Sequence, residues 1–130
     1  MKKLTIILIV ALAMFGCKDN KNREQYACTA SMEPGITIEI RDAVTDDPLA
    51  EAAFAVITSI DYREILIVSH YEGSDSSTAY AVSGAYERPG IYDIEVSLTG
   101  YKNWFRYGVE VTDGVCHVGT VRYTARLEKL

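Results

Sequence analysis

Histidine, cysteine and tryptophan are scarce in this 130-residue chain, which has two, three and one of them. Neither His70 nor His117 stands at a metal-ligand spacing from another histidine or a cysteine, so we expect no metal and no other cofactor. Cys116 and His117 are neighbours, and on a strand they would point to opposite faces instead of forming a nucleophile and its base. We expect both histidines to be exposed, His117 on a strand, and the protein not to be an enzyme.

The chain also lacks an apolar run long enough to span a membrane, since a transmembrane helix needs about 20 apolar residues. Its uncharged, mostly apolar run extends from Leu4 to Phe15, behind the positive start Lys2-Lys3 and before the small residue Gly16. A positive start, a short apolar core and a small-residue exit are typical of a secretory signal peptide. We therefore expect residues 1–16 to be a cleaved signal peptide.

Cys17 follows this signal directly. The sequence Met14-Phe15-Gly16-Cys17 resembles the bacterial lipobox, in which the cysteine receives a diacylglycerol and becomes the new N-terminus after cleavage. The resemblance implies a lipid anchor at Cys17. It would hold the protein in a bacterial cell envelope, on the outer membrane or the cell membrane, facing the periplasm or the exterior. The alternatives are a plain signal peptide, with Cys17 as an ordinary thiol, and an uncleaved anchor.

Three cysteines are an odd number, which is awkward in an oxidising compartment. If Cys17 carries lipid, Cys28 and Cys116 remain as one pair, near the two ends of the expected domain. Export favours a disulfide between them, and two free buried thiols are the alternative.

The chain lacks an excess of positive charge. Removal of 16 of the 130 residues would leave 114 and take away Lys2 and Lys3, which moves the formal net charge from −5 to −7. A nucleic-acid partner would require a basic patch, so we exclude that class. Electrostatic binding to a membrane surface is excluded in the same way, and membrane attachment would depend on the lipid.

Helical periodicity is absent as well, and period two dominates after a polar, flexible tether that we place at residues 17–32. Apolar and polar residues alternate over 36–40 and 92–98, and Leu66-Ile67-Val68 predicts a strand covered on both faces. A change of phase near Gly119-Thr120 predicts a β-bulge in the last strand. Seven or eight short strands with turns between them predict an all-β, antiparallel β-sandwich over residues 33–130.

Three segments resemble the carboxypeptidase regulatory-like domain, a transthyretin-like β-sandwich. Residues 36–49 (ITIEIRDAVTDDPL) resemble its first strand and D-x-x-T-G-x-P-L turn, 87–96 (ERPGIYDIEV) its P-G-x-Y-x-V-x-V entry, and 100–104 (GYKNW) its G-Y-x-x-W/F turn. The resemblance covers residues 33–130 and implies a non-catalytic accessory or tethered module. The transthyretin-like fold also includes a hydroxyisourate hydrolase, but that enzyme's Tyr-Arg-Gly-Ser ending is absent here.

One surface site is suggested by strand parity, which groups Lys102, Trp104 and Arg106 opposite Phe105, Tyr107 and Val109. If the second group faces the core, Trp104 is displayed between two cations and could contact a carbohydrate or a protein. The alternative is a partly covered Trp104 that lies over a sheet edge or stacks on one of the cations.

We therefore expect a membrane-anchored, non-enzymatic lipoprotein with a structural or protein-interaction role in the cell envelope. The alternative is a surface module that binds glycan or peptide through an exposed Trp104, and a transthyretin-like hydrolase is a distant third. The expected partners are the membrane, through the lipid, and an envelope protein or glycan.

Overall fold

The computed structural model describes residues 26–69 and 81–130, and all regular structure in these residues is β. The eight strands are β1 (Ile36–Asp42), β2 (Phe54–Thr58), β3 (Arg63–Ile65), β4 (Ile67–Ser69), β5 (Ala81–Gly84), β6 (Gly90–Ser97), β7 (Trp104–Val111) and β8 (Val121–Leu127). The predicted all-β class is confirmed here. The predicted signal peptide, Cys17 and His70 lie outside the described residues. Within residues 26–69 and 81–130, no helix has the length and apolar character needed to cross a membrane.

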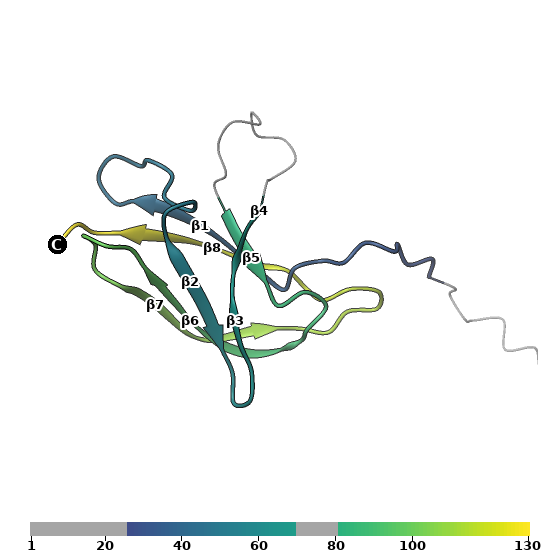
Figure 1. The fold of residues 1–130 in the computed structure, drawn as a ribbon. Helices are drawn as coiled ribbons and strands as arrows, with labels where there is room; N and C mark the ends of the chain where they lie inside the picture. Colours follow the sequence, from purple (N-terminus) through teal and green to yellow (C-terminus); the bar gives the residue numbers. More distant parts are fainter. Residues whose placement is uncertain (1–25, 70–80) are drawn as a thin grey trace, which may run out of the picture.

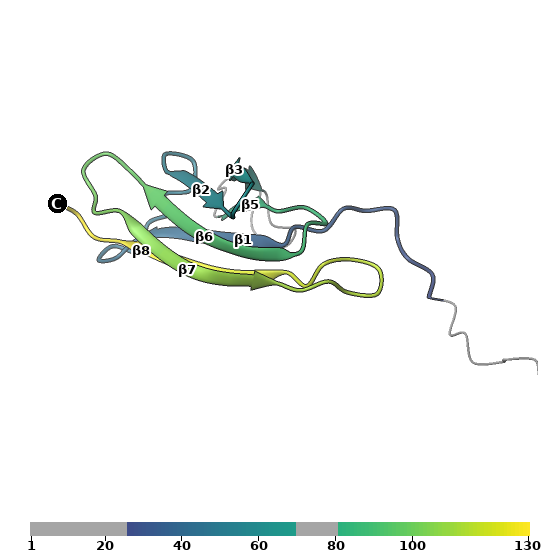
Figure 2. The same cartoon turned by 90° about the horizontal axis from the view of Figure 1, so that it is seen from below.

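The strands form two four-stranded sheets, which we call sheet A (order β4-β5-β1-β8) and sheet B (order β3-β2-β6-β7). Figure 1 shows the two sheets with the C-terminus at one end and the described N-terminal segment leaving at the other. In the turned view of Figure 2, β1 and β8 form one layer beside the layer of β6 and β7. One core cluster draws its residues from both sheets, which is the arrangement of a β-sandwich.

The core follows the alternation in the sequence. Ile36, Ile38 and Ile40 of β1 are fully buried, and so are Tyr92 and Ile94 of β6. Each large apolar side chain of this kind contributes on the order of 1.5–3 kcal/mol when it leaves water. The predicted alternation in these two strands is confirmed.

The pairing of β1 corrects the prediction of a purely antiparallel sandwich. β1 is antiparallel to β5, but it runs parallel to β8 over its whole length, from the pair Ile36 and Val121 to the pair Asp42 and Leu127. Side-chain alternation specifies which face of a strand is buried. It does not specify the direction of the neighbouring strand, so the parallel pair could not be found in this way.

The segment from β3 to β4 passes from sheet B to sheet A at Leu66. The Leu66 side chain is buried, whereas Ile67 and Val68 are 61% and 41% exposed, so the prediction that this strand is covered on both faces is wrong. Its three consecutive apolar residues mark a change of sheet. The Leu66 N–H donates a hydrogen bond to the carbonyl of Ala55, and Gly84 gives the leucine room because a Cβ there would collide with Cδ2 of Leu66.

A β-bulge in β7 changes the phase of that strand. Tyr92 pairs with Val109 and Ile94 with Arg106, so one residue of β6 lies opposite two residues of β7. Gly108 is one of those two and has a φ of 65°, a conformation that glycine adopts readily. Trp104 and Arg106 therefore lie on the core side before the bulge, and Val109 lies on it afterwards.

The bulge predicted at Gly119-Thr120 is wrong. Residues 112–120 form a loop and β8 begins at Val121, so the change of phase in the sequence marks the start of a strand. The loop is fixed to the sandwich by the N–H of Gly119, which donates to the carbonyl of Thr112, and by the Thr120 hydroxyl, which donates to the carbonyl of Pro34 at 2.7 Å.

Candidate functional site

A disulfide joins the segment before β1 to the loop between β7 and β8. Cys28 and Cys116 are bonded, with their Cα atoms 5.3 Å apart and a separation of 88 positions in sequence. This is the pairing that the cysteine count predicted. The N-terminal segment is therefore covalently fixed to the end of the sandwich from which it leaves (Figures 1 and 2).

Thr29 and His117 each follow one of the bonded cysteines, and they form a hydrogen-bonded chain with Glu87. We call these three residues the joint. The His117 ring lies 2.6 Å through Nδ1 from Oε1 of Glu87 and 2.9 Å through Nε2 from the Thr29 hydroxyl. A carboxylate only accepts hydrogen bonds, so Nδ1 carries a hydrogen and donates the hydrogen bond to Glu87. The expectation that His117 is an exposed strand residue is wrong, because it is partly buried in loop 112–120 with both ring nitrogens engaged.

Glu87 connects this joint to the start of the sandwich. Its carboxylate accepts the N–H of Glu33 at 2.7 Å and the N–H of Val118 at 3.2 Å, and its own N–H donates to the carbonyl of Glu33. The Glu33 N–H, followed by the bonds from His117 and Val118, lowers the pKa of Glu87 against the opposing effect of burial. The carboxylate therefore binds both the incoming segment and loop 112–120.

The order hydroxyl, imidazole, carboxylate is also that of a nucleophile with its base and orienting acid. Acyl transfer further requires a substrate cavity and donors for the oxyanion. Three hollows in the described surface lie near Tyr92, Thr37 and Phe54, and none of them is lined by a residue of the joint. The bonds of the joint attach the N-terminal segment to loop 112–120 and to Glu87.

The sequence alone could not identify the joint, but the disulfide gave a usable signal. Two bonded cysteines bring their sequence neighbours together, and Thr29 and His117 each follow one of them. Glu87 is distant in sequence and reaches the joint through the turn after Ala85, where Ala85 and Glu87 have φ values of 52° and 49°.

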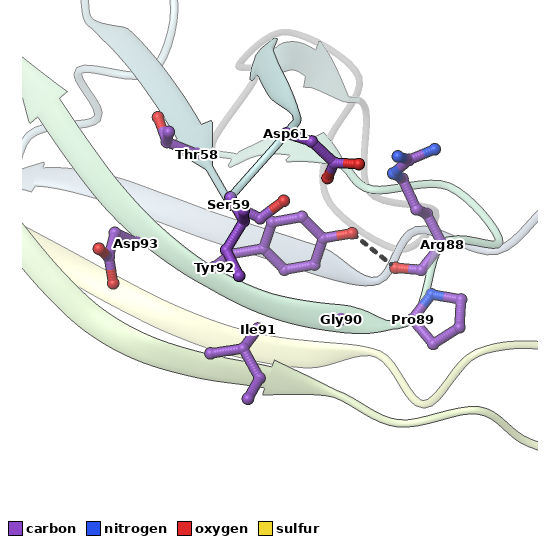
Figure 3. A pocket seen from close by; sticks show the side chains of 10 residues that line it. Thr58, Ser59, Asp61, Arg88, Pro89, Gly90, Ile91, Tyr92 and Asp93 are labelled. Atoms are coloured by element: carbon purple, nitrogen blue, oxygen red, sulfur yellow. Dashed lines mark hydrogen bonds between the residues drawn. The ribbon is translucent and has the colours of Figure 1, made fainter.

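The largest of these hollows is an open groove of about 730 Å³ beside Tyr92 (Figure 3). It lies between the β2–β3 hairpin and the start of β6, and its lining includes Thr58, Asp61, Arg88, Ile91 and Asp93. The buried ring of Tyr92 forms its floor, and its hydroxyl donates to the carbonyl of Arg88 at 2.9 Å. Burial is the main cause of a raised pKa of Tyr92, so the hydroxyl stays protonated and structural.

The predicted surface site at Lys102, Trp104 and Arg106 has a different geometry. Lys102 pairs with Glu128 at 2.9 Å, Trp104 is partly buried against the core, and the guanidinium of Arg106 lies 4.7 Å from the ring centroid of Tyr123. β7 contacts β8 of the other sheet, and the two strands overlap in the view of Figure 2. Trp104 is therefore not displayed between two cations.

The exposed aromatic residues of β7 are Phe105 and Tyr107, which would have to face the core for Trp104 to be displayed. They are 46% and 70% exposed, and their rings stack with centroids 6.0 Å apart and an angle of 4° between the planes. The condition under which Trp104 would be displayed is thus wrong, because the bulge at Gly108 separates these two residues from the buried Val109.

Metal chemistry finds no support in the part of the chain that the structure describes, where no group of three or more histidine, cysteine or acidic residues could hold an ion. No protein-family model matches the chain, and no curated protein matches it in sequence.

Proposed function

We propose that the chain is a lipid-anchored, non-enzymatic lipoprotein of a bacterial cell envelope that presents a transthyretin-like, carboxypeptidase regulatory-like sandwich for protein interaction. The observation that carries the proposal is the attachment made by the disulfide and the joint. The disulfide and Glu87 fix the segment that leads back to Cys17 onto one end of the sandwich. The tether expected at residues 17–32 is therefore held on the sandwich at Cys28 and Thr29.

The geometry gives the anchored domain a defined reach. Cys17 lies eleven residues before Cys28, and an extended chain spans at most about 40 Å over that length. The joint would therefore stay close to the membrane. The C-terminus and the β1–β2 turn lie at the opposite end of the sandwich and would point away from it (Figure 1).

The proposed family is supported by contacts between the residues that carry the resemblance. Tyr101 of the G-Y-x-x-W segment donates a hydrogen bond to Asp42 of the D-x-x-T-G-x-P-L segment. Asp46 takes the place of that motif's glycine and has a φ of 62°, the conformation for which glycine is favoured. Tyr92 of the P-G-x-Y segment donates to the carbonyl four residues before it, in the manner of a tyrosine corner.

Fractionation of cells tests the anchor. The unaltered chain is expected in the membrane fraction, and Cys17→Ser is expected to lose the lipid and move to the soluble fraction. Cys28→Ser is the matched control, because it removes a cysteine but leaves the lipid, and it should remain with the membrane. If Cys17→Ser fractionates like the unaltered chain, the proposal is wrong.

A second candidate is a binding module centred on Phe105 and Tyr107 instead of Trp104. The specific observation in its favour is the exposure of both rings on an outer sheet face. It is compatible with the anchored protein.

A further inference from the structure

The outer face of sheet B exposes large apolar side chains around a column of carboxylates. Register places Ile65, Val56, Glu95 and Phe105 in one row across β3, β2, β6 and β7. Residues directly opposite one another on neighbouring strands lie about 5 Å apart at Cβ, so this row is continuous. Phe54, Asp93, Ile91, Tyr107 and Glu110 share the same face, and of all these residues Val56 alone is buried.

The outer face of sheet A carries paired polar residues where the outer face of sheet B carries exposed apolar ones. There, Thr37 and Ser83 are buried and hydrogen-bonded to each other at 3.1 Å, and Arg41 pairs with Glu39 at 3.2 Å. An outer sheet face with satisfied polar residues is the ordinary solvent face of a sandwich. An exposed patch of aromatic and aliphatic residues marks an interaction surface instead.

The charges on the outer face of sheet B restrict what can cover it. Asp93, Glu95 and Glu110 are acidic, and Arg63 is the single basic strand residue that the described register places there. A second copy of the chain would bring carboxylates against carboxylates, and an anionic lipid surface would be repelled in the same way. A cationic group is attracted both by the carboxylates and by the faces of Phe105 and Tyr107.

The groove beside Tyr92 extends this face at one end. Thr58, Ile91 and Asp93 line the groove and also lie on the outer face, so the two surfaces are continuous. Asp61 adds a carboxylate to the groove (Figure 3). Arg88 is the basic residue of the lining, and its guanidinium lies 3.8 Å from the ring centroid of Tyr62. A long cationic side chain lying across the sheet can therefore enter the groove.

We propose that the outer face of sheet B, from Ile65 to Phe105 and Tyr107 and into the groove, binds a basic protein segment in which pairs of Lys or Arg residues are interspersed with pairs of apolar residues. The inference rests on the proposed function, because it names the partner class of an interaction module. In an extended segment every second side chain points to the same face, so paired residues place both cations and apolar side chains on the face toward the sheet. Its cations meet Glu95, Glu110 and the aromatic rings, and its apolar side chains meet Val56, Ile65 and Phe54.

Fluorescence anisotropy of a labelled hexapeptide, Lys-Lys-Val-Val-Lys-Lys, tests this binding. The probe is titrated with the full chain in nanodiscs of zwitterionic lipid, and the signal from empty nanodiscs is subtracted. We expect saturable binding that weakens between 50 and 500 mM salt, roughly the range over which screening of exposed charges becomes strong. A peptide with Glu in place of Lys should bind at least about tenfold more weakly.

Variants locate the surface. Phe105→Ser with Tyr107→Ser should weaken binding at least about tenfold, and Glu95→Gln with Glu110→Gln should weaken it roughly threefold and reduce its salt dependence. Thr124→Ala, on the outer face of sheet A, is the matched control and should bind like the unaltered chain. Circular dichroism and an intact disulfide show that each variant is folded.

The inference is overturned if the Lys and Glu peptides bind equally, or if neither double variant differs from Thr124→Ala. The proposed partner class is also wrong if the Lys peptide does not bind but cell-wall glycan fragments or anionic vesicles do. Loss of that binding in the Phe105 and Tyr107 variant would place it on the same face. Failure of the lipid anchor is measured by the fractionation experiment, which does not depend on the outer face of sheet B.

Discussion

The hydroxyl of Tyr101 donates a 2.8 Å hydrogen bond to Oδ2 of Asp42 and joins the turn after β6 to the turn after β1. The other carboxylate oxygen, Oδ1, accepts the N–H groups of Val44 at 2.8 Å and Thr45 at 3.0 Å. One nearly buried carboxylate thus fixes two turns that belong to different sheets, at the end of the sandwich opposite the joint.

Asp42 predicts a dependence of stability on pH. The N–H groups of Thr45 and Val44, and then the Tyr101 hydroxyl, hold the pKa of Asp42 well below its ordinary value of 3.8. A carboxylate with a lowered folded pKa stabilises the fold above its unfolded pKa of about 4, and this contribution is lost as the pH falls toward the folded pKa. Asp42→Asn should lower the melting temperature at pH 7 by about 5 °C or more.

The difference in melting temperature between the unaltered chain and Asp42→Asn should become smaller as the pH falls below 4. Differential scanning calorimetry between pH 7 and pH 2 measures it. Asp113→Asn, in an exposed part of loop 112–120, serves as the control and should leave the melting temperature unchanged. A difference that stays constant over the whole range would contradict the role given to the Asp42 charge.

The disulfide should be a large part of the stability of the domain. It closes a loop of 88 residues, and the chain-entropy model gives about 4 kcal/mol for a loop of that length. Urea unfolding of the oxidised chain, of the reduced chain and of the Cys28→Ser, Cys116→Ser variant measures the difference. We expect reduction and the double variant to lower the free energy of unfolding alike. Equal stability of the oxidised and reduced chains would refute this.

Glu87 should hold the N-terminal segment on the sandwich. Glu87→Ala removes the acceptor of the Glu33 and Val118 N–H groups, so their amide hydrogen exchange should accelerate by about tenfold or more. Thr29→Val removes the bonds of the Thr29 hydroxyl to His117 and Ser31 but no bond to Glu87, and it should leave these two amides protected. Exchange that is unchanged in Glu87→Ala would show that the Glu87 carboxylate does not hold the segment.

The passage of Leu66 between the sheets should require glycine at position 84. A Cβ at Gly84 would overlap the Leu66 side chain, and such overpacking costs about 1–3 kcal/mol. Gly84→Ala should therefore be destabilised in urea unfolding. The same substitution made in a Leu66→Ala background should cost clearly less, because the overlap is gone. Additive effects of the two substitutions would place the cause elsewhere.

The features that the sequence predicted are local or follow from counting. Ile36, Ile38 and Ile40 gave the buried face of β1, and three cysteines with one set aside gave the pair Cys28 and Cys116. Period-two alternation records which side chains leave water, and this property does not depend on the neighbouring strand.

The features that the sequence did not predict depend on distant partners. The parallel pairing of β1 with β8 is set by the path of the whole chain, and the three apolar residues starting at Leu66 do not reveal a change of sheet. The bulge at Gly108 reversed the faces of Phe105 and Tyr107, because a single inserted residue shifts every earlier side chain to the other side. The joint of Thr29, His117 and Glu87 exists only once three distant segments have met.

Intact-mass measurement of the protein isolated from its own cells tests the lipid anchor most directly. The account predicts a chain that begins at Cys17, carries the added mass of a diacylglycerol on that residue and is recovered from the membrane fraction. A chain that still begins at Met1, or one that carries an unmodified Cys17, would contradict it.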